Sequence, residues 1–171
     1  TFIDYLQNNK NNGKGYSIKK GLYSAKYSKI ILFDGDLELF TSDISKLMIL
    51  NKHKNIYSVV GHRFRSLNPL RSSFDYGNFI FTLFFNLMNG SCFKDVLCCA
   101  KSFYKEDVKV KNLKSDGFDF DIEVLSYLLK NKKNNRILDI PIKYKRRGIQ
   151  EGKKLQISDG WTILKRLILS L

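Results

Sequence analysis

The chain is poor in cysteine and in acidic residues, and it has no long apolar run. Its three cysteines, Cys92, Cys98 and Cys99, are odd in number and match no metal-ligand spacing. Neither a disulfide framework nor a cysteine metal site is therefore indicated. The cysteines lie in an apolar and aromatic stretch, which predicts reduced, partly buried thiols and a reducing compartment.

No apolar run reaches the roughly 18 residues that a membrane-spanning helix requires, and no signal peptide opens the sequence. We therefore expect a protein that is soluble or lies on a membrane. The sequence also lacks an initiator methionine, and Thr1 to Gln7 resemble the middle of a segment. We expect a fragment or a processed chain whose first part is missing.

Acidic residues are scarce relative to basic ones: 16 Asp and Glu stand against 30 Lys and Arg, for a formal net charge of +14. Such a surface attracts phosphates, acidic lipids or nucleic acid, and the charge alone does not choose among them. The composition is that of a globular protein, and a length of 171 residues suits one domain with a sizeable core.

The sequence does contain an apolar segment, Lys29 to Phe33, that runs directly into three carboxylates, Asp34, Asp36 and Glu38. The apolar run predicts a strand buried on both faces, of the kind found in parallel sheets with helices on either side. Ligands bind where such strands end. Short carboxylates one residue apart suit a hard divalent cation that also holds phosphate. The alternative is a solvated Asp-Gly turn.

Residues 7–15 form a polar loop that ends in Gly13, Lys14 and Gly15. The glycines permit close backbone approach, and Lys14 supplies a cation. The helical spacing from Tyr16 to Tyr27 would aim a helix N-terminus at a phosphate. The Walker spacing is absent, so the loop is not a P-loop, and an ordinary flexible loop is an equal alternative.

A basic segment follows the next predicted strand, over residues 55–60. Arg63 comes just past the end of that strand, and Arg65 and Arg71 follow. Guanidinium groups at such a place suit planar oxyanions such as phosphate, and the alternative is a solvated basic loop.

Tyr76 to Met88 is the most aromatic stretch and is apolar nearly all round. It predicts a helix buried in the core, which is the default, or a helix at a membrane surface, since it is too short to span. A shorter helix is expected before it, capped by Ser42 to Ser45, with an apolar stripe from Ile44 to Leu50.

The segment from Asp95 to Lys101 should form a strand or turn that brings its two charged ends toward one site. A later turn opens a helix whose start carries three acidic residues, Asp119, Asp121 and Glu123. The helix dipole favours acidic residues in a first turn, which is a sufficient structural reason. Their density is nevertheless unusual in so basic a chain.

The last third of the chain contains an edge strand, a loop and a helix. Residues 136–144 read as an edge strand, because Pro141 cannot donate to a central ladder. Residues 145–156 form a basic loop with two glycines that we expect to be mobile. Residues 157–171 form an amphipathic helix with Trp161, which suits a membrane interface and, equally well, packing on a sheet.

Taken in order, five motifs resemble glycosyltransferase family 2 enzymes with a GT-A fold, and among them the dolichol-phosphate mannosyltransferase-like and polyprenyl-phosphate glycosyltransferases. The motifs cover nearly the whole chain: Asn12-Gly13-Lys14-Gly15 before a helix; residues 33–38, where the family has D-A-D-L; residues 59–64, where it has V-V-G-S-R; residues 95–101, where it has D-x-x-C-G-x-K; and residues 139–154. Each motif is weak alone, but five in the family's order form a strong match.

The resemblance implies an α/β fold, with a GT-A (Rossmann-like) mixed sheet flanked by helices, and residues 1–171 would form a single partial domain. Asp34 and Asp36, with Glu38 near the same ion, would hold Mg²⁺ or Mn²⁺ on the diphosphate of a nucleotide sugar. The metal would neutralise the charge of the leaving diphosphate.

The resemblance also implies roles for further residues. Lys14 would lie near the nucleotide, Arg63 and Arg71 would face a phosphate of donor or acceptor, and the mobile loop would close over the site with Arg147 and Lys154. A phosphate acceptor needs little deprotonation at neutral pH, so no strong base is required. For a hydroxyl acceptor the candidate bases are Asp95, Asp121 and Glu123. The expected catalytic residues are Asp36, Arg63, Asp95 and Arg147, and the expected substrate-binding residues are Lys14, Asp34, Arg71, Lys101, Asp121, Glu123 and Lys154.

The chain departs from the family pattern in several places. The opening strand with I-P-x-Y-N-E and the second strand ending in D-D-G-S are absent, so the fold should lack its first nucleotide-binding strands. This polypeptide should therefore bind donor poorly or not at all. His62 replaces the usual Ser, Cys99 stands where Gly is common, and Glu38 replaces the Gln of many members, which leaves details around acceptor and metal open.

The leading hypothesis is an inverting glycosyltransferase, peripheral on the cytoplasmic face of a membrane. It would move a hexose from a nucleotide-diphosphate sugar, of the GDP-mannose or UDP-glucose type, to a polyprenyl or dolichyl phosphate. The first alternative is a non-catalytic basic module that binds nucleic acid or acidic membrane. The second is a family 2 glycosyltransferase with a non-lipid acceptor. Nucleic acid is disfavoured as a partner, because its binding would not use carboxylates at strand ends.

Overall fold

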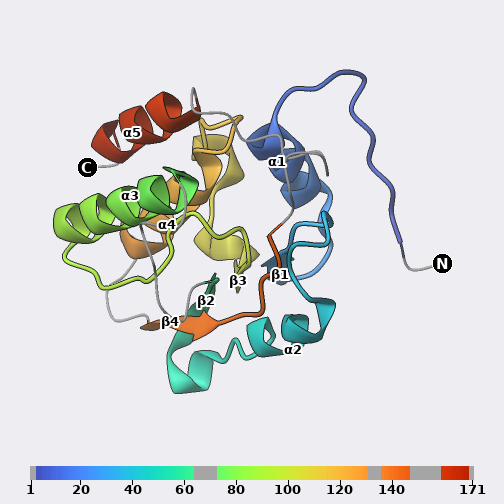
Figure 1. Ribbon diagram of the computed structural model, residues 1–171. Helices are drawn as coiled ribbons and strands as arrows, with labels where there is room; N and C mark the ends of the chain where they lie inside the picture. The colour runs from blue at the N-terminus through green and yellow to red at the C-terminus, as the bar shows by residue number, and fades with distance from the viewer. Residues whose placement is uncertain (1–2, 64–72, 131–135, 147–158, 170–171) are drawn as a thin grey trace.

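A computed structural model of the protein describes residues 3–63, 73–130, 136–146 and 159–169 (Figure 1). The strands of these residues form one mixed sheet in the order β1-β3-β2-β4. Their bounds are Lys29–Leu32 for β1, Ile56–His62 for β2, Lys101–Tyr104 for β3 and Arg136–Pro141 for β4. The predicted α/β fold with a mixed sheet is confirmed.

Helices cover both faces of the sheet. The α-helices in the described part of the chain are α1 (Lys14–Ser24), α2 (Ile44–Leu47), α3 (Ser73–Asn89), α4 (Phe120–Lys130) and α5 (Asp159–Leu169). Figure 1 shows α2 apart from α3, α4 and α5, and the core is divided accordingly. Ile30, Val60 and Phe103 pack toward α1, α3, α4 and α5, whereas Val59 and Tyr104 pack toward α2.

The strand directions bring the predicted site residues to one edge of the sheet. β3 runs antiparallel to both β1 and β2, and β4 runs parallel to β2. The carboxyl ends of β1, β2 and β4 therefore meet the beginning of β3. The register places Lys101, the first residue of β3, opposite Leu32 of β1 and Val60 of β2.

The prediction for β1 is wrong in two respects. The strand pairs antiparallel with β3 and not within a parallel set, and it is the outer strand of the sheet formed by the described residues. It is also not buried along both faces: Lys29 is exposed and Ile30 alone is fully buried. The apolar run identified a strand but not its neighbours, because β3 comes from a distant part of the sequence. β4 is the opposite outer strand, as Pro141 predicted.

The helix predicted over residues 44–50 is shorter, because α2 ends at Leu47. The Asp43 side chain does not cap this helix. It accepts a hydrogen bond from the backbone N–H of Lys143 instead. The carboxylate therefore ties the start of α2 to the segment after β4, and the cap that would favour a longer helix is missing.

The N-terminus of α1 packs directly on the backbone of residues 115–117. Gly13 has a φ of +96°, and a Cβ at this position would lie 2.2 Å from the carbonyl oxygen of Asp116. A Cβ on Gly15 would lie 2.5 Å from the carbonyl oxygen of Ser115. The two glycines of the predicted phosphate loop are thus required by contact within the chain, and they do not by themselves indicate a bound phosphate.

We expect Gly13→Ala to destabilise the protein by about 1–3 kcal/mol, because the new Cβ meets backbone and the φ is left-handed. Gly21→Ala is the matched control, since a Cβ there meets no atom within 4 Å and α1 should gain about 0.5–1 kcal/mol. Urea unfolding measures both changes. A Gly13→Ala variant as stable as the wild type would show that this contact is loose.

Candidate functional site

Four of the predicted site residues form one charge network at the edge where β1 and β2 end. Nζ of Lys14 lies 3.1 Å from Oδ2 of Asp34 and 3.0 Å from Oδ2 of Asp121. The other oxygen of Asp121, Oδ1, accepts a hydrogen bond from Nζ of Lys101 at 2.9 Å. The charges therefore alternate along the network, from Asp34 through Lys14 and Asp121 to Lys101.

Each member of the network comes from a different element. Lys101 begins β3, Asp121 lies in the first turn of α4, Lys14 is the first residue of α1, and Asp34 follows β1. The side chains of Lys101 and Asp121 are buried, that of Lys14 is 18% exposed, and that of Asp34 is 39% exposed. The network thus runs from the core to solvent, and Asp34 is the end that a ligand can reach.

Ion pairing outweighs burial at the centre of the network. Burial opposes ionisation of Asp121, but Lys101 and Lys14 together hold the pKa of this carboxyl below its usual value. Burial also opposes the charge on Lys14, but the carboxylate of Asp121 raises the pKa of that amine above its usual value. Asp121 and Lys14 are therefore both charged at neutral pH.

Arg63 and Asp95 form a second ion pair, between the end of β2 and the segment before β3. Nε of Arg63 lies 2.7 Å from Oδ2 of Asp95, and Nη2 lies 3.0 Å from Oδ1. The side-chain amide of Asn78, on α3, donates to Oδ1 at 3.1 Å. Burial opposes ionisation of Asp95, but Arg63 lowers the pKa of this carboxyl. Asp95 therefore fixes the guanidinium of Arg63, and α3 supports both.

Two buried thiols lie close to these charged groups. Burial, with the charge of Asp95, raises the pKa of Cys98 to about 12. Burial also raises the pKa of Cys99 well above its usual value, although Lys14 lies nearby. All three cysteines are free, and Cys92 is exposed. The prediction of unpaired thiols is confirmed, and that of burial holds for Cys98 and Cys99.

The three predicted metal ligands lie in a tight turn after β1. Oδ1 of Asp36 accepts a hydrogen bond from the N–H of Glu38 at 3.1 Å, and Leu37 between them has a φ of +66°. Among the described residues, no group of three or more His, Cys, Asp or Glu side chains is arranged to hold a metal ion. The metal role of Asp34, Asp36 and Glu38 therefore stays a prediction; two carboxylates in one turn are the oxygen ligands that Mg²⁺ takes together with phosphate oxygens and water.

Glu123 has a structural place apart from the network. Its carboxylate accepts hydrogen bonds from the backbone N–H groups of Lys114 and Ser115 at 2.8–3.0 Å. It also lies 3.3 Å from Nη1 of Arg166, on α5. It thereby holds the loop before α4 and the helix α5 together. Three other predicted site residues lie outside the described residues and stay predictions: Arg71, Arg147 and Lys154.

Two polar contacts involve residues to which the sequence gave no role. Nδ1 of His62 lies 2.6 Å from Oδ1 of Asp139, whose other oxygen accepts the N–H of Lys94 at 2.8 Å. Arg146 forms an ion pair with Asp75 on α3. Each contact joins distant parts of the chain, so no local pattern could predict it. The sequence did offer one indication, since Asp139 is the single acidic residue in the apolar strand β4 and therefore needs a polar partner.

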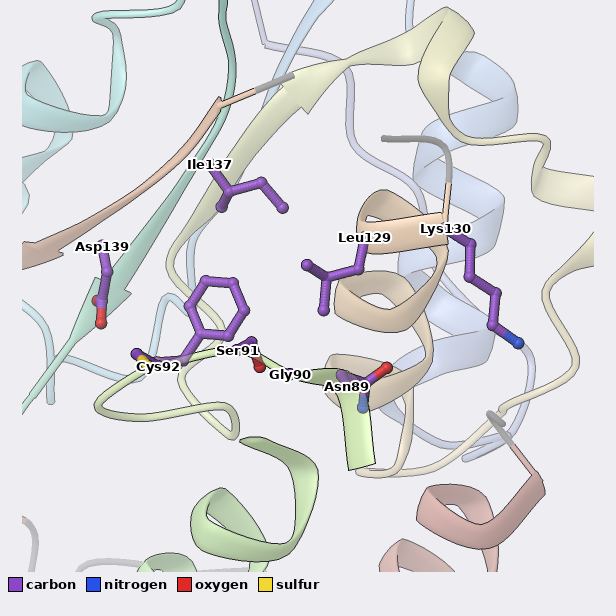
Figure 2. Close-up of a pocket in the computed structure, with 9 residues that line it drawn as sticks. Asn89, Gly90, Ser91, Cys92, Leu129, Lys130, Ile137 and Asp139 are labelled. Carbon is purple, nitrogen blue, oxygen red and sulfur yellow. The ribbon is translucent and has the colours of Figure 1, made fainter. Parts of the chain in front are cut away.

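Two cavities lie near these elements. One, of about 480 Å³, runs along β1 and reaches Asp34 and Cys99. The other, of about 550 Å³, lies between β4 and the C-terminal ends of α3 and α4. Figure 2 shows this second cavity, with Asp139 and Cys92 on one side and Lys130 on the other. Of the two, the cavity along β1 is the one that reaches the charge network.

No protein-family model and no curated protein sequence matches the chain, but solved structures do. A structure of glucosyl-3-phosphoglycerate synthase from Mycobacterium tuberculosis matches with a TM-score of 0.67 and 14% identity, over 92% of this chain and 55% of that chain. The same enzyme with Mn²⁺, uridine-diphosphate and phosphoglyceric acid matches with a TM-score of 0.67 and 13% identity, over 92% and 54%. With Mn²⁺, uridine-diphosphate-glucose and glycerol 3-phosphate, the values are 0.61 and 13%, over 92% and 55%.

These comparisons confirm the expected GT-A fold. The chain spans about half the length of the synthase chains that it matches. At 12–14% identity the likeness concerns the fold alone.

Because two buried carboxylates are ion-paired, the free energy of unfolding should decrease at acid pH. Because the pKa values of Asp95 and Asp121 are lower in the folded than in the unfolded chain, the unfolded chain binds protons first as the pH falls. Their contribution should be complete above about pH 5 and should be lost progressively below about pH 4. Urea unfolding at a series of pH values across this range measures the loss of stability.

The control variants for this prediction are Asp121→Asn and Asp4→Asn. Asp121→Asn leaves the buried Lys101 without its carboxylate and leaves Lys14 with Asp34 alone, so it should lose about 3–5 kcal/mol at neutral pH and show a weaker pH dependence. Asp4, whose side chain is 74% exposed, should change neither quantity when replaced. An unaltered pH dependence in Asp121→Asn would contradict the assignment of the depressed pKa to this residue.

Proposed function

We propose that the protein is a metal-dependent glycosyltransferase that uses a nucleotide-diphosphate sugar, of the UDP-glucose or GDP-mannose type. The observation that carries the proposal is the position of Asp34, at the end of β1 and bonded to Lys14, on the ligand-binding edge of a GT-A sheet. The synthase structures with Mn²⁺ and uridine-diphosphate-glucose support this class of donor and cofactor.

Asp34 and Asp36 are the residues that would hold Mg²⁺ or Mn²⁺, with Glu38 in the same turn. When bound, the ion would neutralise charge on the leaving diphosphate. The Asp36–Glu38 hydrogen bond fixes the turn in advance. Because the ammonium of Lys14 already lies 3.1 Å from Asp34, a diphosphate beside Asp34 would also be within its reach. The diphosphate of the donor would thus contact both the metal ion on the two carboxylates and the ammonium of Lys14.

The carboxylates offered as candidate bases are engaged in other contacts. Asp95 is bound by Arg63, Asp121 by two lysines, and Glu123 by backbone N–H groups. The lowered pKa values of Asp95 and Asp121 make them weak bases. This favours an acceptor that is already ionised at neutral pH, such as a phosphate monoester, and gives these carboxylates a positioning role. Direct attack on the sugar would invert its configuration.

We further propose that the acceptor phosphate is carried by a polyprenyl or dolichyl lipid. The support is α3, whose inward side chains include the polar Asp75, Asn78 and Thr82. Its outward side chains are apolar and exposed: Tyr76, Ile80, Leu83, Phe84 and Leu87. The default prediction that this apolar segment is core is therefore wrong for its outer face, because Asp75, the amide nitrogen of Asn78 and the hydroxyl of Thr82 have partners inside.

Helix α5 carries further exposed apolar side chains. It packs beside α3 (Figure 1) and exposes Trp161, Ile168 and Leu169. None of the helices in the described part of the chain combines the length and the apolar character needed to cross a bilayer. Exposed aromatic and aliphatic side chains on a chain with a net charge of +14 favour contact with an anionic membrane surface. We therefore propose a peripheral position on the cytoplasmic face of a membrane.

The second candidate is a family 2 glycosyltransferase with a small phosphorylated acceptor. The synthase structures with phosphoglyceric acid and glycerol 3-phosphate favour it. A non-catalytic basic module is less favoured, because nucleic acid or acidic lipid has no need for Asp34 and Asp36 at the end of β1. Its binding would fall steeply with salt and would not change in variants of these two residues.

We expect hexose transfer from UDP-glucose or GDP-mannose to polyprenyl phosphate, with Mg²⁺ or Mn²⁺ present. Asp36→Ala should reduce the rate by more than about 100-fold, because loss of the ion removes several kcal/mol of charge stabilisation. Glu106→Ala is the control, because Glu106 is an exposed carboxylate that pairs with Lys52 and does not line the cavity that reaches Asp34.

The outcomes separate the candidates. Product with 3-phosphoglycerate and none with polyprenyl phosphate would select the small acceptor. No product with either acceptor and either metal, or full activity in Asp36→Ala, would refute the enzyme assignment.

The membrane proposal predicts flotation with vesicles that contain phosphatidylserine. A double variant, Leu87→Ser with Trp161→Ser, should float at least about tenfold less, since each wild-type side chain buries apolar area on contact with the bilayer. These side chains are 73% and 75% exposed, so the variant should fold normally. Met48→Ser is the matched control, because Met48 is 62% exposed and lies just after α2. Equal flotation of all three proteins would contradict the proposed surface.

A further inference from the structure

Two pairs of consecutive residues near the site, His62-Arg63 and Lys94-Asp95, are connected to each other at two points. The direct connection joins Arg63 to Asp95, through Nε, Nη2 and the backbone N–H of Arg63. The second connection runs through Asp139 of β4, which contacts both His62 and Lys94. We call this second connection the Asp139 link. Together the two connections close a circuit around the end of β2.

Asp139 is the acceptor in both halves of the Asp139 link. Its Oδ1 lies 2.6 Å from Nδ1 of His62, and its Oδ2 accepts the backbone N–H of Lys94 at 2.8 Å. An ionised carboxylate only accepts hydrogen bonds, so Nδ1 of His62 carries a proton in this contact. Because one small, rigid carboxyl group holds both donors, it sets the distance between His62 and Lys94.

The register of the sheet explains how Asp139 reaches both partners. β4 runs parallel to β2, and the register pairs Asp139 with Val60. His62 lies two residues beyond Val60, so its side chain lies on the same face of the sheet as that of Asp139. Val60 packs on this face in one cluster with Phe85 of α3 and with Phe93. The carboxylate therefore lies between β2 and the segment that follows α3.

The segment that carries Lys94 is itself held by α3. Oδ1 of Asn86 accepts the N–H of Phe93 at 2.9 Å, and Nδ2 of Asn86 donates to the carbonyl of Phe93 at 2.7 Å. A shift of Lys94 relative to α3 therefore requires that these hydrogen bonds break. The Asp139 link thus joins two elements that are each fixed independently, the end of β2 by the sheet and Lys94 by α3.

The orientation of the Arg63 guanidinium depends on both connections. Its Nε and Nη2 meet the buried carboxylate of Asp95, and its Cζ lies 5.4 Å from the centre of the Tyr144 ring. The bidentate pair fixes the guanidinium relative to Asp95. The Asp139 link fixes Asp95 relative to the end of β2, since Lys94 directly precedes Asp95. Only the two together determine where the guanidinium points.

We propose that Asp139 is a positioning residue for Arg63, acting through His62 on one side and Lys94 on the other. It holds the guanidinium in the orientation in which Arg63 meets the phosphate of its ligand. The phosphate in this statement rests on the proposed function, whereas the control of the guanidinium by Asp139 does not. The family pattern has Ser at position 62, so the imidazole contact is a feature of this sequence.

The first test measures the guanidinium directly, by NMR on the whole ¹⁵N-labelled chain. In Asp139→Ala both donors lose their shared acceptor, so hydrogen exchange of the Arg63 Nε–H should accelerate at least about tenfold. Ser102→Ala is the matched control. Oγ of Ser102 donates to the carbonyl of Leu47 at 2.6 Å on the opposite face of the sheet. This variant also loses a buried hydrogen bond, but the Arg63 exchange should change less than about twofold.

Asp139→Asn separates the geometry of the link from its charge. The side-chain amide offers one oxygen to the N–H of Lys94 and one NH₂ group, which donates to Nδ1 of His62 once the imidazole proton has moved to Nε2. The Arg63 exchange should therefore stay within about threefold of the wild type. The ¹⁵N shifts of His62 should meanwhile change from those of the Nδ1–H tautomer to those of the Nε2–H tautomer. A residue that contributed only to overall stability would not produce this change.

The consequence for the proposed function is measured as hexose transfer to polyprenyl phosphate. Asp139→Ala should lower kcat/KM at least about tenfold, because a misdirected guanidinium stabilises the phosphate less well. Asp139→Asn should restore most of this loss. Ser102→Ala should have nearly the kcat/KM of the wild type, since its lost hydrogen bond lies on the other face of the sheet.

Two results would overturn the positioning role. Unchanged exchange of the Arg63 Nε–H in Asp139→Ala would show that the direct pair with Asp95 suffices. Equal acceleration in Asp139→Ala and Ser102→Ala would assign the effect to overall stability. If Asp139→Ala does not fold, Asp139→Asn decides, because an unaltered His62 tautomer there would refute the contact. Absence of hexose transfer in the wild type, with the NMR results as expected, would instead refute the proposed function alone.

Discussion

The site depends on one buried carboxylate that two lysines share. Asp121 lies 3.0 Å from the amine of Lys14 and 2.9 Å from that of Lys101, so it joins the start of α1 and the start of β3 to α4. A buried charge is expensive unless it is paired and hydrogen-bonded. Asp121 satisfies this condition only when all three elements are in place. The geometry of the site is therefore coupled to completion of the fold.

Pairing also determines what a ligand encounters. Lys14 and Lys101 are offset by Asp34 and Asp121, and Arg63 is offset by Asp95. The excess positive charge of the chain thus lies mainly outside these pairs. Asp34 is the most exposed member of its network. An ion bound to its carboxylate would release Lys14 toward an incoming phosphate, because one charge partner of the amine would be occupied. Binding would then rearrange existing pairs without creating an isolated buried charge.

The sequence predicted which residues gather better than it predicted their partners. Asp34, after an apolar strand, and Asp121, at the start of a helix, meet at Lys14 as expected. Asp119 and Glu123, at the start of the same helix, bind Arg166 instead. The meeting of Asp34 and Asp121 depends on β3, which enters antiparallel between β1 and β2, and no local pattern contains that information. The same limit applies to Gly13 and Gly15. Both signalled close approach, but the approaching atoms belong to residues 115 and 116 and not to a phosphate.

Helix α3 shows why the apolar periodicity of the sequence did not predict which face of this helix is buried. Its apolar residues are so many that the pattern favoured burial, yet the helix turns Asp75 and Asn78 inward to Arg146 and Asp95. Buried polar groups require these partners, and satisfying them fixes the rotation of the helix about its axis. The apolar excess is then left outside. The polar contacts that orient Arg63 through Asn78 and Asp95 thereby also set the surface that α3 presents, so the geometry of the site and the exposed apolar face have a common physical cause.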